Sequence, residues 1–153
     1  MKKWQWWLIV AVVIAGGGKM AYDMTRGLRN KNPGNIRHNA ANKWKGQSGV
    51  DDKGFVIFSD YSHGVRAIGK ILDSYKRRGV LTIKQIISEW APNSENDTNA
   101  YLSSVLKYTG QRADLIPVRE EGDYTPLVMA IIKHENGVNP FSRNDVAKWL
   151  AMA

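Results

Sequence analysis

Helical periodicity after residue 60 is the feature that most limits the fold of this chain. Apolar side chains recur at the 3.6-residue spacing of an amphipathic helix over residues 62–78, and Gly79 follows them. Four further segments carry the start and stop residues typical of helices: 82–90, 97–110, 125–135 and a last one from 142. Only residues 44–58 favour strands, as a hairpin around Gly49 to Gly54. We therefore expect a mostly α domain of the α+β class with one small β-hairpin.

The length and composition of the chain fit one globular domain. The chain has 153 residues, of which 43% are hydrophobic and 24% charged, so wholesale disorder is excluded. It has no cysteine, which excludes disulfides, thiolate metal sites and a cysteine nucleophile. The net charge of +8 is usually a sign of a nucleic-acid or anionic-surface partner. However, residues 1–50 hold nine Lys/Arg against one acid, and the remainder is balanced, which makes a nucleic-acid partner the weakest interpretation.

The N-terminal segment is typical of an export signal or a weak membrane anchor. Lys2 and Lys3 precede an uncharged run over residues 4–18. Fifteen residues in a helix span roughly 22 Å, short of the ~30 Å of a hydrocarbon core, so an anchor here is marginal. A cleaved signal peptide and a buried helix of a soluble protein are the alternatives. We expect residues 1–23 to be a signal anchor with a cytoplasmic N-terminus, and residues 24–153 to be an exported domain.

Glu135 stands out among the acids because of its position on the helix predicted for 125–135. Val128, Ile131 and Ile132 precede it by seven, four and three residues, so it ends the apolar stripe. Burial and the negative end of the helix dipole both disfavour the charged carboxylate. A carboxylic acid that keeps its proton can protonate a glycosidic oxygen. The alternative is a solvent-facing Glu at a frayed helix end.

Other motifs for cofactor or metal chemistry are missing from the sequence. The segment HENG (134–137) is not the HExxH motif of zinc proteases, and His38, His63 and His134 are scattered, as surface or capping histidines are. We therefore expect neither a metal nor a cofactor. The aromatic residues Trp44, Trp90, Tyr61 and Tyr101 can stack on sugars or pack in the core.

Several motifs together resemble a phage-associated family of lysozyme-like proteins. They are RGLRNKNPGNIRHN (26–39), FVIFSDYSHGVRAIGKIL (55–72), WAPNSENDTNAYLSSV (90–105) and AIIKHENG (130–137). Lys31 departs from this family, which usually has Asn there. In bacterial glucosaminidases and lytic transglycosylases, which share these pieces, the helix with the catalytic Glu comes first; here it comes last. The resemblance thus implies a circularly permuted lysozyme-like domain with Glu135 as its general acid.

The resemblance also suggests partners for Glu135. A hydrolase needs a second carboxylate. In this fold the hairpin normally lies opposite the Glu across the cleft, and the acids in or just after it, Asp51, Asp52 and Asp60, are the candidates. The substrate-binding candidates are Asn32, Asn35, Arg37, Tyr61, Trp90 and Tyr101. If no acid faces Glu135, a transglycosylase route is favoured.

We expect a monomeric phage endolysin that cuts the β-1,4 glycan strand of peptidoglycan. The N-terminal segment would hold it at the host inner membrane with the catalytic domain in the periplasm, and would leave the bilayer to release active enzyme, as in signal-anchor-release endolysins. A virion or membrane-anchored structural protein that grips murein without cutting it is the first alternative, and a nucleic-acid-binding module is the second.

Overall fold

The structure is a computed structural model that describes residues 24–153, so the predicted anchor over 1–23 lies outside the described residues. Over the described range the chain forms six helices and one two-stranded antiparallel sheet, which is the α+β class expected from the sequence. In chain order these are α1 (Arg26–Arg29), β1 (Gln47–Val50), β2 (Val56–Phe58), α2 (Tyr61–Arg77), α3 (Ile83–Trp90), α4 (Thr98–Thr109), α5 (Tyr124–Asn136) and α6 (Arg143–Leu150).

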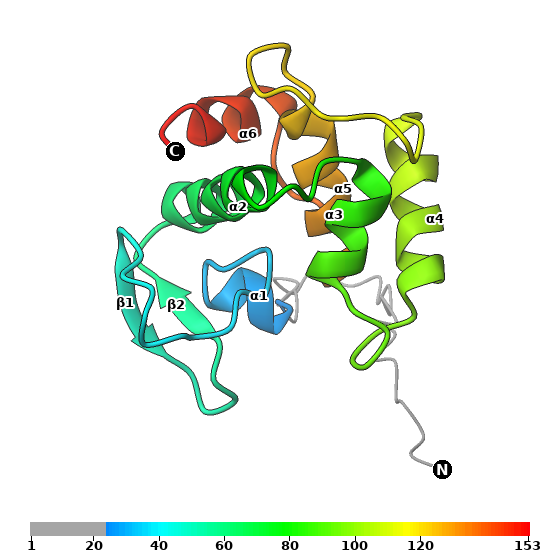
Figure 1. Cartoon of the computed structure of the whole chain (residues 1–153). Helices are drawn as coiled ribbons and strands as arrows, with labels where there is room; N and C mark the ends of the chain where they lie inside the picture. The colour runs from blue at the N-terminus through cyan, green and yellow to red at the C-terminus, as the bar shows by residue number, and fades with distance from the viewer. Residues whose placement is uncertain (1–23) are drawn as a thin grey trace, which may run out of the picture.

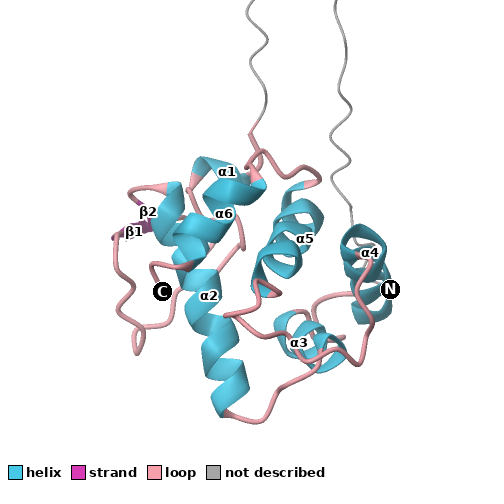
Figure 2. Cartoon of the chain, turned by 90° about the horizontal axis from the view of Figure 1, so that it is seen from above, coloured by secondary structure: helices cyan, strands magenta, loops and turns pink. Residues whose placement is uncertain are grey.

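Helix α5 lies at the centre of the domain. It packs against α4 on one side and α6 on the other, and also contacts α1 and α2 (Figures 1 and 2). Leu127, Val128, Ile131 and Ile132 on α5 are fully buried. Burying a side chain of this size contributes about 1.5–3 kcal/mol, so packing, more than helix propensity, fixes the position of α5.

The helix ends follow the signals in the sequence to within one residue. Thr82 caps α3 in a capping box with Gln85, and Asp97 caps α4 by accepting from the backbone N–H of Ala100. Gly110 and Gly137 end α4 and α5 in the left-handed conformation that glycine adopts without strain. Gly137 therefore ends α5 directly after Asn136, so that Glu135 and Asn136 belong to the last turn of the helix.

The hairpin is shorter than the 44–58 segment predicted for it. Strands β1 and β2 pair with a bulge between Gln47 and Gly49, and Arg37 forms an isolated bridge to Phe55 beside them. One element was not expected from the sequence: the single-turn helix α1, capped by the Thr25 side chain. It falls within the polar stretch 25–39, whose asparagines, Pro33 and Gly34 favour turns by their sequence.

An asparagine turn, defined here as residues 30–36, packs between α5, the hairpin and α2. Asn32 is fully buried; its amide donates to the carbonyls of Ile36 and Val56, and its side-chain oxygen accepts from the Ile36 N–H, each at 2.9 Å. Gly64 on α2 lets the turn approach closely, since a Cβ there would lie 2.2 Å from the Lys31 carbonyl oxygen. The turn is thus fixed on two sides.

No helix among residues 24–153 combines the length and the apolar character needed to cross a membrane.

Candidate active site

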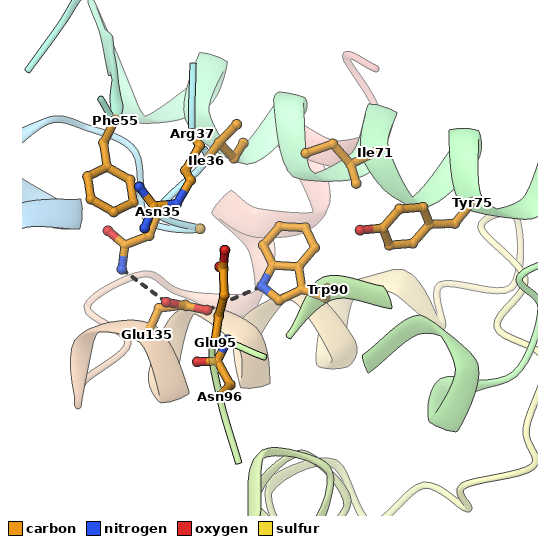
Figure 3. Close-up of a pocket in the computed structure, with 11 residues that line it drawn as sticks. Asn35, Ile36, Arg37, Phe55, Ile71, Tyr75, Trp90, Glu95, Asn96 and Glu135 are labelled. Carbon is orange, nitrogen blue, oxygen red and sulfur yellow. Dashed lines mark hydrogen bonds between the residues drawn. The ribbon is translucent and has the colours of Figure 1, made fainter. Parts of the chain in front are cut away.

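Glu135 occupies the last turn of α5, where its carboxylate accepts three hydrogen bonds from side chains. Oε1 accepts from Tyr101 Oη at 2.9 Å and from Trp90 Nε1 at 3.2 Å, and Oε2 accepts from Asn35 Nδ2 at 3.0 Å (Figure 3 shows the bonds from Asn35 and Trp90). All three donors are neutral, and no cation pairs with Glu135 in the part of the chain that the structure describes. The carboxylate is held in place without being neutralised by a salt bridge.

The hydrogen bonds distinguish the two oxygens of this carboxylate. An ionised carboxylate offers about two lone pairs on each oxygen. The two bonds to Oε1 use both of its lone pairs, whereas Oε2 accepts one bond and keeps one lone pair free. A proton carried by Glu135 therefore resides on Oε2.

Two of the donors come from α3 and α4, which pack against each other. Trp90 is the last residue of α3, and Tyr101 on α4 is only 1% exposed. Burial, followed by the neighbouring Glu135 charge, raises the pKa of Tyr101 well above its ordinary value, so its hydroxyl remains a donor at physiological pH. The His134 ring lies against the Tyr101 ring with centroids 3.7 Å apart. Burial lowers the pKa of His134 although the Glu135 charge opposes this, which favours a neutral ring in the stack.

The third donor, Asn35, comes from the asparagine turn. Its backbone has a φ of +48°, in the left-handed region that Asn tolerates better than most residues. Asn136 joins this turn to α5: its amide donates to the Pro33 carbonyl at 2.8 Å, and its side-chain oxygen accepts from Thr25 Oγ1 at 2.6 Å. A buried polar contact directly beside Glu135 thus sets the position of Asn35.

These residues form one side of a groove with a volume of about 470 Å³, which we call the Glu135 groove. Its lining residues are Gly34, Asn35, Ile36, Arg37, Phe55, Ile71, Tyr75, Trp90, Glu95, Asn96 and Glu135. Arg37 and Phe55 lie at one end and Ile71 and Tyr75 at the other, with Glu135 and Trp90 between them (Figure 3). The Arg37 guanidinium lies over the Phe55 ring, 4.6 Å from its centroid. The groove therefore has a cationic end and an apolar, aromatic end.

The three acids proposed as a second catalytic group do not line this groove. Asp51 pairs with Arg26 at 2.7 Å and accepts from Asn30 and from the backbone N–H groups of Lys53 and Phe55. Desolvation alone would raise the pKa of Asp51, but these hydrogen bonds outweigh it and hold the pKa below its ordinary value. Asp51 thus closes the hairpin loop, a role that its sequence position beside a turn did not distinguish from catalysis.

Asp52 and Asp60 also have partners elsewhere. Asp52 is exposed and binds the same Arg26 guanidinium at 2.9 Å. Asp60 caps α2 by accepting from the Ser62 N–H at 2.7 Å, and the hydrogen bonds from Ser62 lower its pKa.

The predicted substrate-binding residues divide into two sets. Asn35, Arg37 and Trp90 line the groove, and Tyr101 contacts Glu135 from the protein interior. Asn32 and Tyr61 lie elsewhere, because Asn32 is buried and Tyr61 donates to the Leu28 carbonyl at 2.8 Å and packs on Phe141. Neither of these two side chains faces the groove.

Sequence reasoning missed five groove residues outside the asparagine turn: Phe55, Ile71, Tyr75, Glu95 and Asn96. Tyr75 lies on the amphipathic helix predicted over residues 62–78, where it was not singled out as a site residue. Burial raises its pKa to about 12, so its hydroxyl is a donor. Glu95 and Asn96 stand in the WAPNSENDT segment, whose resemblance to family motifs was a usable signal. Among residues 24–153 no group of His, Asp and Glu side chains is arranged to hold a metal ion.

Comparison with known proteins gives one informative relative. No family model matches the chain. Protein P5 of Pseudoalteromonas phage PM2 is 36% identical over 133 residues, an alignment that covers 82% of this chain and 80% of that protein. Similarity of this extent shows common descent over most of both chains, and the chain therefore belongs to the family of Protein P5 of Pseudoalteromonas phage PM2.

Proposed function

We propose that this chain is a phage glycosidase that cuts the β-1,4 glycan strand of peptidoglycan with Glu135 as its general acid. The observation that carries this proposal is the Glu135 carboxylate, held by three neutral donors in the wall of a groove. Structural carboxylates at a helix end are usually paired with a cation or turned to solvent. A carboxylate that is held at both oxygens and keeps one lone pair of Oε2 free fits proton delivery to a leaving group.

The chemistry asked of Glu135 is the transfer of one proton to the glycosidic oxygen as the bond to C1 breaks. The proton on Oε2 leaves without disturbing the bonds to Oε1, so Trp90 and Tyr101 hold the carboxylate before and after the transfer. Asn35 beside Oε2 fixes its direction. This pre-orientation is the part of general acid catalysis that the protein supplies.

The lining of the Glu135 groove suits an acidic, N-acetylated glycan. Aromatic side chains such as Trp90 and Tyr75 stack on sugar rings, and the Asn35 and Asn96 amides can bind N-acetyl groups. Arg37 suits the carboxylates of the stem peptides of peptidoglycan, which a neutral glycan lacks.

A circularly permuted lysozyme-like fold is supported by one adjacency. In the unpermuted order the asparagine-rich turn follows the Glu helix along the chain. Here the two are a hundred residues apart, yet Asn136 on α5 donates to the Pro33 carbonyl and Asn35 donates to Glu135. A permutation requires this contact, because it changes chain order and keeps spatial neighbours.

A lytic transglycosylase is the second candidate, and one observation favours it. The hairpin acids Asp51, Asp52 and Asp60 lie outside the groove lining, and a transglycosylase needs only Glu135, which acts as acid and then as base. Reducing ends in the released muropeptides identify hydrolysis, and anhydro ends identify transglycosylation.

The proposed setting is lysis of the host cell from the periplasm, with residues 1–23 as an inner-membrane anchor that releases the enzyme. The phage relative and the basic, then apolar, N-terminal pattern support this. Fractionation before and after collapse of the membrane potential tests it: the protein should move from the membrane to the soluble fraction. Lysis by protein that stays wholly in the membrane contradicts release.

The decisive test is a murein zymogram with the full chain carrying Glu135→Gln. We expect clearing to fall at least about 100-fold, because Gln has no proton to deliver. The fold should survive, since the Asn35 side-chain oxygen is buried without a partner and can accept from the new amide once the Asn35 amide turns over.

Glu121→Gln, at an exposed position outside the groove, is the matched control and should clear fully. Full clearing by the Glu135 variant refutes the catalytic role. Binding of the unsubstituted protein to murein sacculi without release of soluble fragments identifies a structural murein-binding protein instead.

A further inference from the structure

Glu95 is the one other carboxylate in the lining of the Glu135 groove, as far as residues 24–153 are concerned. It belongs to the loop between α3 and α4, is exposed, and rises into the groove in Figure 3. Its side chain has no hydrogen bond or ion pair within the described chain, unlike Asp51, Asp52 and Asp60. It is therefore available to water and to a ligand in the groove.

The loop that carries Glu95 is fixed at both ends. It starts at Trp90, whose Nε1 donates to Glu135, and the Pro92 carbonyl accepts from the backbone N–H groups of Glu95 and Asn96 at 2.9 and 3.0 Å. At the other end, Thr98 Oγ1 donates to the Ala91 carbonyl at 2.5 Å. The loop that carries Glu95 is thus connected to Glu135 through Trp90, whose side chain donates to the Glu135 carboxylate.

We propose that Glu95 is the general base that activates water for hydrolysis in this groove, the second carboxylate of an inverting pair. This rests on the proposed function of Glu135 and adds the group that determines the reaction route. A base that acts through a water molecule needs room and solvent access, which an exposed, unpaired carboxylate provides. A carboxylate that attacks C1 itself must be held as firmly as Glu135 is, and Glu95 is not.

The step balances as one hydrolysis. Glu135 gives its Oε2 proton to the glycosidic oxygen, and the C1–O bond breaks with its electron pair going to that oxygen. A water on the opposite face of the sugar bonds to C1 through its oxygen, and Glu95 takes its proton. One water is consumed, a C1 hydroxyl and a C4 hydroxyl are formed, and exchange with solvent returns the two carboxyl groups to their starting states.

The test uses the full chain in mild detergent with purified murein sacculi and soluble glycan strands. Glu95→Gln should lower the release of reducing ends at least about 100-fold, and Glu121→Gln should leave it unchanged. Glu95→Ala should be rescued by sodium azide, because azide attacks C1 without losing a proton, and the product should be an α-glycosyl azide. Proton NMR of the unsubstituted enzyme should show the α-anomer as the first product.

Each result decides the proposal. A Glu95→Gln variant that keeps activity within two-fold overturns it, as does a first product in the β configuration or an alanine variant that azide does not rescue. Anhydro ends from the unsubstituted protein, with Glu95→Gln unaffected, overturn the role of Glu95 and leave that of Glu135 standing. An unsubstituted protein that cuts no glycan overturns the proposed function, and the role of Glu95 with it.

Discussion

Glu135 accepts hydrogen bonds from three side chains, whereas the Glu95 carboxylate has no such bond within the part of the chain described by the structure. Both carboxylates line one groove. Glu135 ends a helix whose apolar face is fully buried, and Glu95 projects from an exposed turn. The lining of the groove thus holds two chemically identical groups with very different rigidity.

The supporting residues differ in the same way. The asparagine turn beside Glu135 is held by the buried side chains of Asn32 and Asn136, while the loop over residues 91–97 is bonded mainly through its backbone and the exposed Asn93. A general acid must present its proton to one atom, and a group that acts through water tolerates more motion. The difference therefore corresponds to the roles proposed for the two carboxylates.

The largest predicted effect is on stability, and it compares Asn32, in the asparagine turn beside Glu135, with Asn93, in the loop that carries Glu95. Asn32→Ala removes three buried hydrogen bonds to the backbone and leaves the Ile36 N–H without its partner, although the Ile36 carbonyl still accepts from the Val56 N–H. We expect it to lower the free energy of unfolding by about 3 kcal/mol. Asn93→Ala removes a single 3.3 Å bond to the Thr98 N–H and should change stability by less than about 0.5 kcal/mol. Urea unfolding followed by circular dichroism measures both. Equal losses of stability in the two variants would show that the asparagine turn and the loop over residues 91–97 depend equally on side-chain hydrogen bonds.

A smaller effect is expected from loosening Glu135 without removing it. Tyr101→Phe deletes one of the two donors to Oε1, and Trp90 remains as the other. One lost hydrogen bond to a charged group is worth about 1.5 kcal/mol, so murein cleavage should fall roughly 10-fold. Tyr108→Phe on the same helix is the control, because Tyr108 is 43% exposed. Unchanged cleavage by the Tyr101 variant would mean that positioning of Glu135 does not limit the reaction.

The sequence alone predicted most of the helical framework. The helices and their caps were readable because Thr82, Asp97 and Gly137 carry local chemistry that acts within one turn. The single-turn helix α1 could not be predicted from the sequence, because four residues are too few to show a periodicity. It is held in place by its contacts with α5, which are far away along the chain.

At the candidate site, sequence reasoning singled out Glu135 but not Glu95, and the reason is physical. Glu135 ends an apolar stripe, which is a local pattern, and Asn35 belongs to the motif over residues 26–39 that carries the family resemblance. The choice among Asp51, Asp60 and Glu95 depends on long-range contacts: whether Arg26 or a helix N-terminus already binds the carboxylate. Spacing along the chain contains no such information.

The smallest predicted effect on stability concerns backbone strain in the asparagine turn. Lys31 has a φ of +51°, and Asn35 is the only other non-glycine residue with positive φ in the described chain. Asn adopts this region more readily than Lys, and Asn is the usual residue here in the family that the chain resembles. Relief of this strain in Lys31→Asn should therefore raise the free energy of unfolding by about 0.5 kcal/mol. The variant also loses the exposed hydrogen bond from Lys31 Nζ to the Ser59 carbonyl, which reduces this gain. Lys43→Asn, at an exposed position without positive φ, should have no effect in the same urea titration. A loss of stability in the Lys31 variant would mean that the side-chain bond outweighs the strain, and that the asparagine turn depends on Lys31 for its attachment to the segment before α2.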